Sequence, residues 1–216
     1  MKKFFKWLII IILLVVVIIL GVYGLKSLFN QEKSYSSGKP VEVAKQLDSI
    51  SGFDYVLYDD STELYKELYY ELKDILEAEE IDYGKYAEVI SKMFVVDFYT
   101  LSTKVTNQDV GGLDFIYSDI KDNFKLKASD TLYKYIESNV YGDREQELPE
   151  VSDFTVCESS VSSYSYEDLE NDISISDDNS YVVKVSWSYK KDLGYQKSAV
   201  IRLVHEDDVL SIVSVE

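Results

Sequence analysis

One acidic side chain stands in a helical stretch that is otherwise apolar, and it is the first candidate for chemistry. Asp97 lies within residues 94–101, which are apolar almost all round apart from Asp97 and Thr100. Burial raises the pKa of a carboxylate, and a raised pKa is one mark of a general base. In the alternative interpretation, Asp97 is structural and accepts hydrogen bonds from a tyrosine hydroxyl, Lys104 or the Gly111–Gly112 backbone. A buried carboxylate needs a partner in either case.

The other chemistry-bearing residues predict no catalytic or metal centre and no cofactor. His205 is the only histidine, which excludes two-histidine sites, and we expect it at a surface or a sheet edge. The sequence has no G-x-S-x-G, no phosphate-binding loop and no G-x-G-x-x-G. Asp177-Asp178-Asn179 lacks EF-hand spacing, so a solvated cluster is the better interpretation. The only cysteine, Cys157, is expected to be a small buried packing residue.

Tyrosines are concentrated in the first two predicted helices. They are Tyr65, Tyr69, Tyr70, Tyr83, Tyr86 and Tyr99. A tyrosine buries its ring and keeps a polar tip in water, which suits a binding surface and equally suits the rim of a small core. If an interface exists, Tyr65, Tyr69 and Tyr70 are its first candidates, because they share a side that has few leucines.

The amino-terminal region contains a long apolar run. Residues 7–25 have no charged side chain, and a helix of that length spans about 28 Å, close to the roughly 30 Å hydrocarbon core of a bilayer. The run therefore predicts a single transmembrane helix that binds the lipid bilayer. The residues that mark its ends are Trp7, Leu8, Leu20 and Tyr23.

Flanking charges predict the orientation of this anchor. Lys2, Lys3 and Lys6 precede it, so residues 1–6 are expected to be a cytoplasmic stub and the rest of the chain to lie outside the cell membrane. The rival interpretation is a cleaved signal peptide. Its apolar region would be about 7–15 residues and would end in small residues, whereas residues 22–26 make a poor cleavage site.

Net charge restricts the possible partners. The formal net charge is -17, and without Lys2, Lys3 and Lys6 the chain has 19 basic against 39 acidic residues. Phosphates would be repelled, so nucleic acids and anionic lipid surfaces are excluded as partners. A basic partner or a cation-rich wall polymer is more compatible, although the charge also serves solubility alone.

The pattern of residues predicts one folded domain after a linker. Residues 26–44 are polar and form the linker, and residues 45–216 form an extracytoplasmic α+β domain. Its helical part covers residues 59–143 and its strands cover residues 151–216. Because the helices come first and the strands second, the sheet is expected to lay its apolar face on the helices.

Helical spacing of apolar residues predicts several helices. One begins at Asp60, whose spacing to Glu63 resembles a capping box, and the next begins near Asp82 and runs to Leu101. The other predicted pieces are a short helix before an extended segment in residues 45–58, a short helix at 113–124 and a helix at 127–140.

After Pro149 the apolar residues alternate with a period of two. The predicted strands are 154–166, 183–189, 199–203 and 209–215, and an acidic loop is predicted at 167–179. Short turns between neighbouring strands require antiparallel pairing, so the strands are expected to form a four-stranded meander.

This order of elements resembles the nuclear transport factor two-like superfamily, also called the cystatin-like roll. With one amino-terminal membrane helix, the chain is similar to type IV secretion and conjugation scaffold proteins of the VirB-eight kind. Phe94-Val95-Val96-Asp97-Phe98-Tyr99 and Asp109-Val110-Gly111-Gly112 also resemble segments of single-pass membrane proteins of Firmicutes. The resemblance implies a domain that assembles with other envelope proteins. The superfamily also contains isomerase-like enzymes with an aspartate base in an apolar cone.

Two functions are therefore expected from the sequence. The first is a membrane-anchored extracytoplasmic binding or scaffolding domain that acts by protein–protein association in the bacterial cell envelope, in a secretion or conjugation assembly or by self-association. The alternative is a membrane-tethered small-molecule binder or isomerase-like enzyme that uses Asp97 in an apolar pocket.

Overall fold

The computed structural model describes residues 42–216. The predicted stub and membrane segment, and residues 26–41 of the predicted linker, lie outside the described residues, as do the predicted anchor residues Trp7, Leu8, Leu20 and Tyr23. Across residues 42–216, none of the helices has the length and the hydropathy that a membrane crossing needs.

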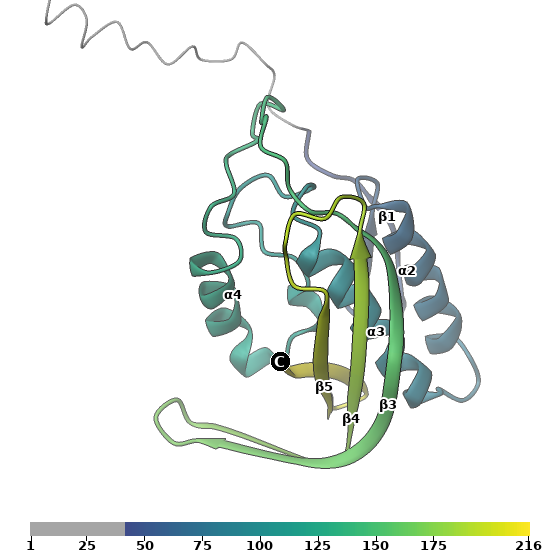
Figure 1. Cartoon of the computed structure of the whole chain (residues 1–216). Helices are drawn as coiled ribbons and strands as arrows, with labels where there is room; N and C mark the ends of the chain where they lie inside the picture. The colour runs from purple at the N-terminus through teal and green to yellow at the C-terminus, as the bar shows by residue number, and fades with distance from the viewer. Residues whose placement is uncertain (1–41) are drawn as a thin grey trace, which may run out of the picture. The chain divides into compact units, whose positions relative to one another are not determined.

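A four-stranded antiparallel sheet forms one layer of the domain, and its strands follow one another in chain order (Figure 1). The strands are β3 (Val151–Asp168), β4 (Ile173–Tyr189), β5 (Ser198–Glu206) and β6 (Val209–Val215). The predicted α+β class and the antiparallel meander are confirmed.

The acidic loop predicted at 167–179 is wrong, because β3 and β4 continue as a paired ribbon until Asp168 lies opposite Ile173. The Asp168 carboxylate accepts hydrogen bonds from the backbone N–H groups of Glu170 and Asn171, at 3.0 and 3.2 Å. These bonds close a tight turn, which leaves Glu167, Asp177 and Asp178 on strands instead of in a loop.

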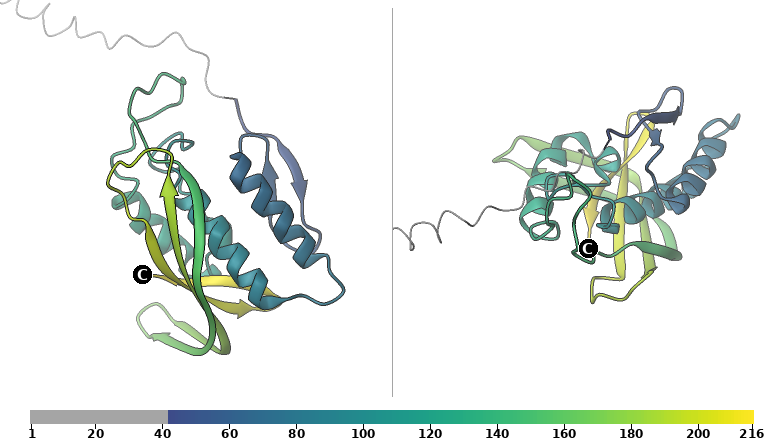
Figure 2. Two further views of the ribbon diagram at one scale, coloured as in Figure 1. Left: turned by 45° about the vertical axis from the view of Figure 1, so that its right-hand side comes forward. Right: turned by 90° about the horizontal axis from the view of Figure 1, so that it is seen from above.

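Two long helices accompany the sheet. α2 (Glu63–Leu76) packs on α3 (Tyr83–Tyr99), and α3 also contacts β3 and β4 (Figure 2). Eleven of the 17 residues of α3 are buried. A helix that is apolar on most faces belongs at the centre of a core, and the burial of α3 agrees with that expectation.

The starts of the two helices depend on different capping residues. Asp82 caps α3 as predicted, and its carboxylate accepts the Lys85 N–H at 3.1 Å. The cap predicted at Asp60 is wrong, because Thr62 caps α2 by accepting the Tyr65 N–H at 3.2 Å. Threonine caps helices nearly as well as aspartate. The spacing between Asp60 and Glu63 therefore could not decide whether Asp60 or Thr62 caps the helix.

A small hairpin precedes α2. It consists of β1 (Gln46–Ser49) and β2 (Val56–Tyr58), which pair antiparallel. The short helix predicted in residues 45–58 is therefore wrong, whereas the extended segment at its end is confirmed. Gly52 has a φ of +85° between the strands, and this left-handed conformation lets the chain reverse there.

The segment between the helices and the sheet differs most from its prediction. Two short 3₁₀ turns, η1 (Leu113–Phe115) and η2 (Ser118–Ile120), lead into α4 (Lys121–Asp130). The helix predicted at 127–140 is wrong, since α4 ends at Asp130. Beyond it, the chain turns so that Tyr133 is buried and its hydroxyl donates to the Phe98 carbonyl at 2.6 Å.

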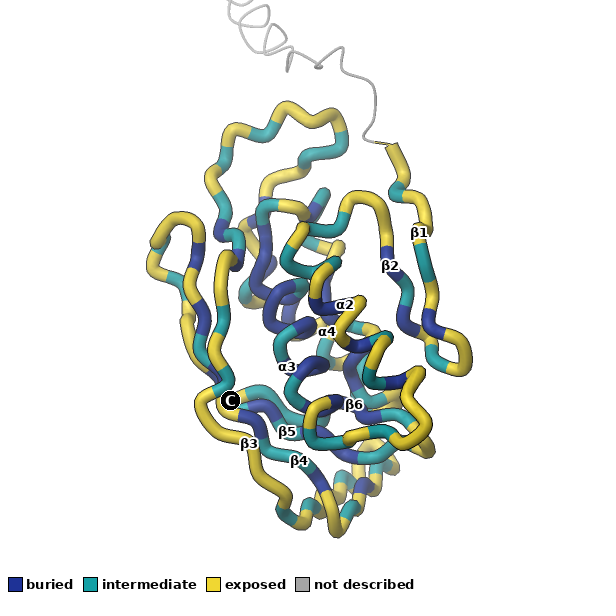
Figure 3. The backbone as a smooth tube through the Cα atoms, turned by 90° about the vertical axis from the view of Figure 1, so that its right-hand side faces the viewer, coloured by how far each residue is buried: buried dark blue, intermediate teal, exposed yellow. Residues whose placement is uncertain are grey.

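The buried residues lie mainly along α3 and along the strands that it contacts (Figure 3). Trp187 of β4 lies against Tyr99 of α3, with ring centroids 4.5 Å apart. Cys157 was expected in the core, and that expectation is wrong because Cys157 is exposed on β3. Strand alternation there is broken by a bulge between Val156 and Glu158, which shifts the following side chains.

Candidate functional site

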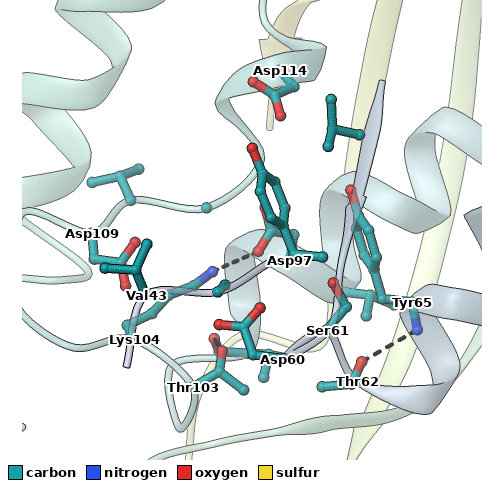
Figure 4. Close-up of a pocket in the computed structure, with 17 residues that line it drawn as sticks. Val43, Asp60, Ser61, Thr62, Tyr65, Asp97, Thr103, Lys104, Asp109 and Asp114 are labelled. Atoms are coloured by element: carbon teal, nitrogen blue, oxygen red, sulfur yellow. Dashed lines mark hydrogen bonds and ion pairs between the residues drawn. The ribbon is translucent and has the colours of Figure 1, made fainter. Parts of the chain in front are cut away.

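A cleft of about 320 Å³ lies beside the carboxyl end of α3 (Figure 4). Its walls come from β2 and the segment before α2, from Tyr65 of α2, from the last turn of α3 and from the segment that follows α3. Segments far apart in the sequence therefore meet around one space, and Asp97 lines it.

Asp97 is held by two partners in the cleft. Lys104 Nζ lies 2.5 Å from Asp97 Oδ1, and the Gly112 N–H donates to Asp97 Oδ2 at 2.6 Å. The Lys104 side chain is only 9% exposed and that of Asp97 is 33% exposed. The structural interpretation named Lys104 and the Gly111–Gly112 backbone as partners, and both contacts are present.

The paired glycines allow this close approach. A Cβ atom on Gly111 would lie 2.6 Å from Lys104 Nζ, so only glycine fits beside the ion pair. Gly112 has a φ of +73°, and a Cβ there would lie 2.7 Å from a ring carbon of Phe94. The Gly111 N–H donates to the Tyr133 hydroxyl at 3.1 Å, which fixes the loop from its other side.

Tyrosine and carboxyl groups in the cleft influence each other. Burial raises the pKa of Tyr65 well above its ordinary value, and the nearby carboxylates of Asp97 and Asp114 raise it further. Desolvation also raises the pKa of Asp114, Lys121 opposes that change, and Asp97 adds to it. The cleft therefore disfavours additional negative charge.

The arrangement does not resemble an apolar cone with a free base. Both Asp97 oxygens already accept hydrogen bonds, and hydroxyl and carboxyl side chains line much of the cleft, including Ser61, Thr103 and Asp60. In residues 42–216, no group of three or more His, Cys, Asp or Glu side chains is placed to hold a metal ion. Both oxygens of the one carboxylate predicted as a base are therefore already engaged with Lys104 and Gly112.

The three tyrosines proposed for an interface do not share one exposed surface. Tyr65 is half-buried and lines the cleft, Tyr69 is fully buried, and Tyr70 is 50% exposed. The Tyr69 and Tyr70 rings meet edge to face at 5.6 Å. Of the three, only Tyr70 presents a large exposed ring to a partner.

A second candidate site is the end of the β3–β4 ribbon, of which the sequence prediction gave the first strand as far as residue 166 and missed the returning strand. We call residues 162–180 the arm. Beyond Tyr181, β4 has no register partner on β5, so the two strands of the arm pair only with each other. Tyr166 is 43% exposed and Leu169 at the tip is 85% exposed. The alternation of Tyr164, Tyr166, Ile173 and Ile175 is the signal that predicts the ribbon.

Two contacts fix the base of the arm to β5. Arg202 donates to Ser162 Oγ at 3.0 Å, and its guanidinium lies 5.2 Å from the Tyr164 ring centroid. On the other strand, Asp177 Oδ2 accepts the His205 N–H at 2.8 Å and lies 2.8 Å from His205 Nδ1. The arm therefore leaves the sheet in a defined direction.

His205 lies near the end of β5, beyond Leu203, the last residue of β5 that pairs with β4, so at this point β5 pairs only with β6. This agrees with the expected edge position, and the His205 side chain is 31% exposed. Its ring is 5.1 Å from that of Tyr83, which joins the base of the arm to the first turn of α3. Desolvation raises the pKa of Asp177, but hydrogen bonds from His205 and Asn179 outweigh it and lower that pKa overall.

Comparison with known proteins assigns the chain to no family. The chain matches no protein-family model, no curated protein and no solved structure.

Proposed function

We propose that the protein is a membrane-anchored binding domain that associates with a basic protein of the cell envelope through the arm. The observation that carries this proposal is the arm itself, a ribbon fixed at its base with exposed apolar side chains at its far end. The proposed location is the outer side of the cell membrane, with residues 7–25 as the anchor.

The shape of the arm supports association. A two-stranded ribbon is at best marginally stable alone in water, and here its base is held to β5 by the contacts with Arg202 and His205. The Leu169 side chain contributes little to the stability of the folded domain, because 85% of its surface is exposed. A partner that covers Leu169 and Tyr166 would bury apolar surface worth about 25 cal/mol per Å².

The charge of the arm supports a basic partner. Residues 162–180 contain six acidic residues and no Lys or Arg. Complementary charge steers such a surface toward a positive patch and speeds encounter. Like charge opposes pairing of two arms from two copies, so a heterologous partner is favoured over self-association.

The resemblance to secretion and conjugation scaffolds agrees with this proposal. Such scaffolds place one soluble domain on one membrane helix and assemble with other envelope proteins. An anchor confines the domain to the membrane plane and raises its effective concentration toward membrane-bound partners. The specific assembly is part of the proposal and rests on that resemblance alone.

The test is site-specific photo-crosslinking of the full-length protein in the cells that produce it. A photoreactive residue at Leu169 should crosslink to one basic envelope protein, and the same residue at Leu126 of α4 should not. Leu126 is a matched control because it is also a leucine and is 62% exposed. Equal crosslinking at both positions, or none at Leu169, would contradict the proposal, and a crosslinked homodimer would replace it with self-association.

The alternative small-molecule function is supported by the cleft, but its isomerase-like form has weaker support. A ketosteroid-type base needs an unoccupied carboxylate facing apolar substrate, whereas Asp97 is paired with Lys104 and with the Gly112 N–H. The proposal therefore assigns Asp97 a structural role. Turnover of a ketosteroid that is lost in Asp97→Asn would reverse that assignment.

A further inference from the structure

β3 forms one edge of the four-stranded sheet, and its outer side is open. The strand order is β3-β4-β5-β6, so β3 is the outermost strand on its side (Figure 1). Among residues 42–216, β4 is the only strand that pairs with β3, and no isolated bridge reaches it. An edge strand directs every second backbone N–H and C=O away from the sheet, and these groups can pair with another extended chain.

The opposite edge of the sheet is short and covered. β6 has seven residues. The Tyr117 N–H donates to the Ile212 carbonyl of β6 at 3.0 Å, and Ile116 forms a parallel bridge with Ile212. β3 has 18 residues and contains no Pro, Lys or Arg, although prolines, lysines and covering segments are the usual means of blocking an edge. Of the two edges, the one at β3 is therefore available for pairing.

The middle of β3 is the most accessible part of this edge. We call residues 158–162 the edge window, because they pair with β4 in unbroken register between two bulges. Residues 158–161 are all exposed, and Val161 is 57% exposed. Serine occupies three of the five positions, and such small side chains leave the backbone accessible. The bulges limit regular pairing with an added strand to this window.

The hydrogen bonds of β4 show which residues of the edge window direct their backbone outward. The Trp187 N–H donates at 2.9 Å to the carbonyl of the residue before β5, so it faces β5. Backbone directions alternate along a strand, so Val183 and Tyr181 also face β5. Their register partners on β3 are Ser159 and Val161. The backbone N–H and C=O groups of Ser159 and Val161 therefore point to the open edge.

Charge narrows the kind of chain that fits this edge. β3 carries four carboxylates and no basic side chain. Among the described residues, only Glu158 of these four forms an ion pair, with Lys184 of β4. A second copy of β3 would add four more like charges, whereas an extended segment with lysine or arginine side chains would offset them.

We infer that the basic partner binds by β-strand addition, in which an extended segment that contains lysine or arginine pairs with β3 as a fifth strand across the edge window. Its backbone exchanges hydrogen bonds with Ser159 and Val161, and its alternate side chains approach the carboxylates of β3. This inference rests on the proposed association for the identity of the partner and specifies how that partner binds. The edge window leads directly into the arm at Ser162, so one segment can cover both.

Proline substitution tests the edge directly. Proline is tolerated on an edge strand where its N–H would face solvent, but it cannot donate a hydrogen bond to an added strand. Ser159→Pro should therefore leave β3 in the sheet and block the added strand. Ser159→Thr is the matched control, because it keeps the N–H and should not block the strand. Circular dichroism checks that both variants fold.

A synthetic peptide supplies the added strand. The probe is a peptide of about nine residues in which lysine alternates with threonine and valine. Its controls are the glutamate counterpart and a lysine peptide with two adjacent central prolines, which lacks a donor on each edge. In fluorescence anisotropy with the full-length protein in nonionic detergent, the lysine peptide should bind about tenfold or more tightly than either control. Ser159→Pro should weaken its binding about tenfold, and Ser159→Thr should leave it unchanged.

Amide hydrogen exchange on the unsubstituted protein gives a second readout that does not depend on the variants. The N–H groups of Ser159 and Val161 should become protected when the lysine peptide binds. The N–H of Ser160 is the internal control, because its register partner Val182 faces β3 and the bond between the strands is already present.

The outcomes separate this inference from the proposed association. Equal binding of either control peptide, unchanged exchange at Ser159 and Val161, or no binding tighter than about 1 mM would overturn strand addition, and a crosslink at Leu169 would still support the association. Binding and protection as expected, without a crosslink at Leu169, would support strand addition and reject the tip as the contact. Dimerisation that Ser159→Pro abolishes would assign the edge to a second copy and overturn the basic partner.

Discussion

The floor of the cleft and the arm use polar residues in opposite ways. In the cleft floor, Asp97, Lys104 and Gly112 satisfy one another, and Lys104 is nearly buried. In the arm, most side chains face water, and the polar contacts with β5 serve to set its direction. The buried polar network in the cleft therefore stabilises the fold. The exposed side chains of the arm make few contacts with the rest of the domain and are accessible to a partner.

The largest expected effect comes from breaking the cleft floor with Asp97→Ala. This change leaves the Lys104 ammonium and the Gly112 N–H without their acceptor. The expected loss in free energy of unfolding is about 3 kcal/mol, the low end for a buried pair because Asp97 is 33% exposed. Urea unfolding followed by tryptophan fluorescence measures it.

The control for Asp97→Ala is the double variant Asp97→Asn, Lys104→Met, which keeps an acceptor for Gly112 and removes the buried charge. It should recover most of the lost stability. A loss below about 1 kcal/mol for Asp97→Ala would mean that the floor is no stronger than a surface ion pair.

The next effect separates close packing from backbone strain. Gly112 and Gly142 both have left-handed φ angles, +73° and +69°, but a Cβ would meet Phe94 at 2.7 Å only in Gly112. Gly142→Ala should cost about 1 kcal/mol from strain, and Gly112→Ala should cost about 1–3 kcal/mol more from overpacking. Thermal unfolding of the two variants side by side measures the difference, and equal losses would exclude tight packing at Gly112.

A smaller effect is expected for Tyr133→Phe. The Tyr133 hydroxyl donates to the Phe98 carbonyl and accepts the Gly111 N–H, and burial raises its pKa, so it stays protonated. Its removal should cost about 1–2 kcal/mol. Tyr135→Phe is the control because Tyr135 is 76% exposed. A change of the same size in both variants would argue against a role for the Tyr133 hydroxyl.

The base of the arm should loosen in acid. The pKa of Asp177 is lowered below 3.8 in the folded protein, so its contribution is present above that value and is lost as the pH falls through the folded pKa. The groups that act on Asp177 are His205 and Asn179, and Asp177 in turn raises the pKa of Tyr181. The expected contribution is under about 1 kcal/mol. The NMR shift of the His205 amide should report it, and Asp177→Asn should abolish the transition.

The smallest effect on stability should come from the tip of the arm. Leu169→Ser removes an apolar side chain that is 85% exposed, so the free energy of unfolding should change by less than about 0.5 kcal/mol. The same variant should lose the crosslinked partner. A loss of stability comparable to that of Tyr133→Phe would mean that the tip is part of the fold and not a free surface.

Sequence patterns predicted the parts of the structure where one physical demand dominates. The apolar period of α3 and the cap at Asp82 gave that helix, and the need of a buried carboxylate for a partner pointed to Lys104. The helix at 127–140 failed because the distant contact of Tyr133 with Phe98 overrides local preference. The returning strand of the arm was missed because an exposed acidic strand has the composition of a loop.

β4 runs without a break from the turn at the arm's tip to Trp187, which lies against Tyr99 in the middle of the folded body. Tension applied at the tip therefore travels along one covalent strand into the core. The contacts of Arg202 and His205 with the arm lie between the tip and the paired part of β4 and β5, so they are the first contacts on β5 that such a pull would load.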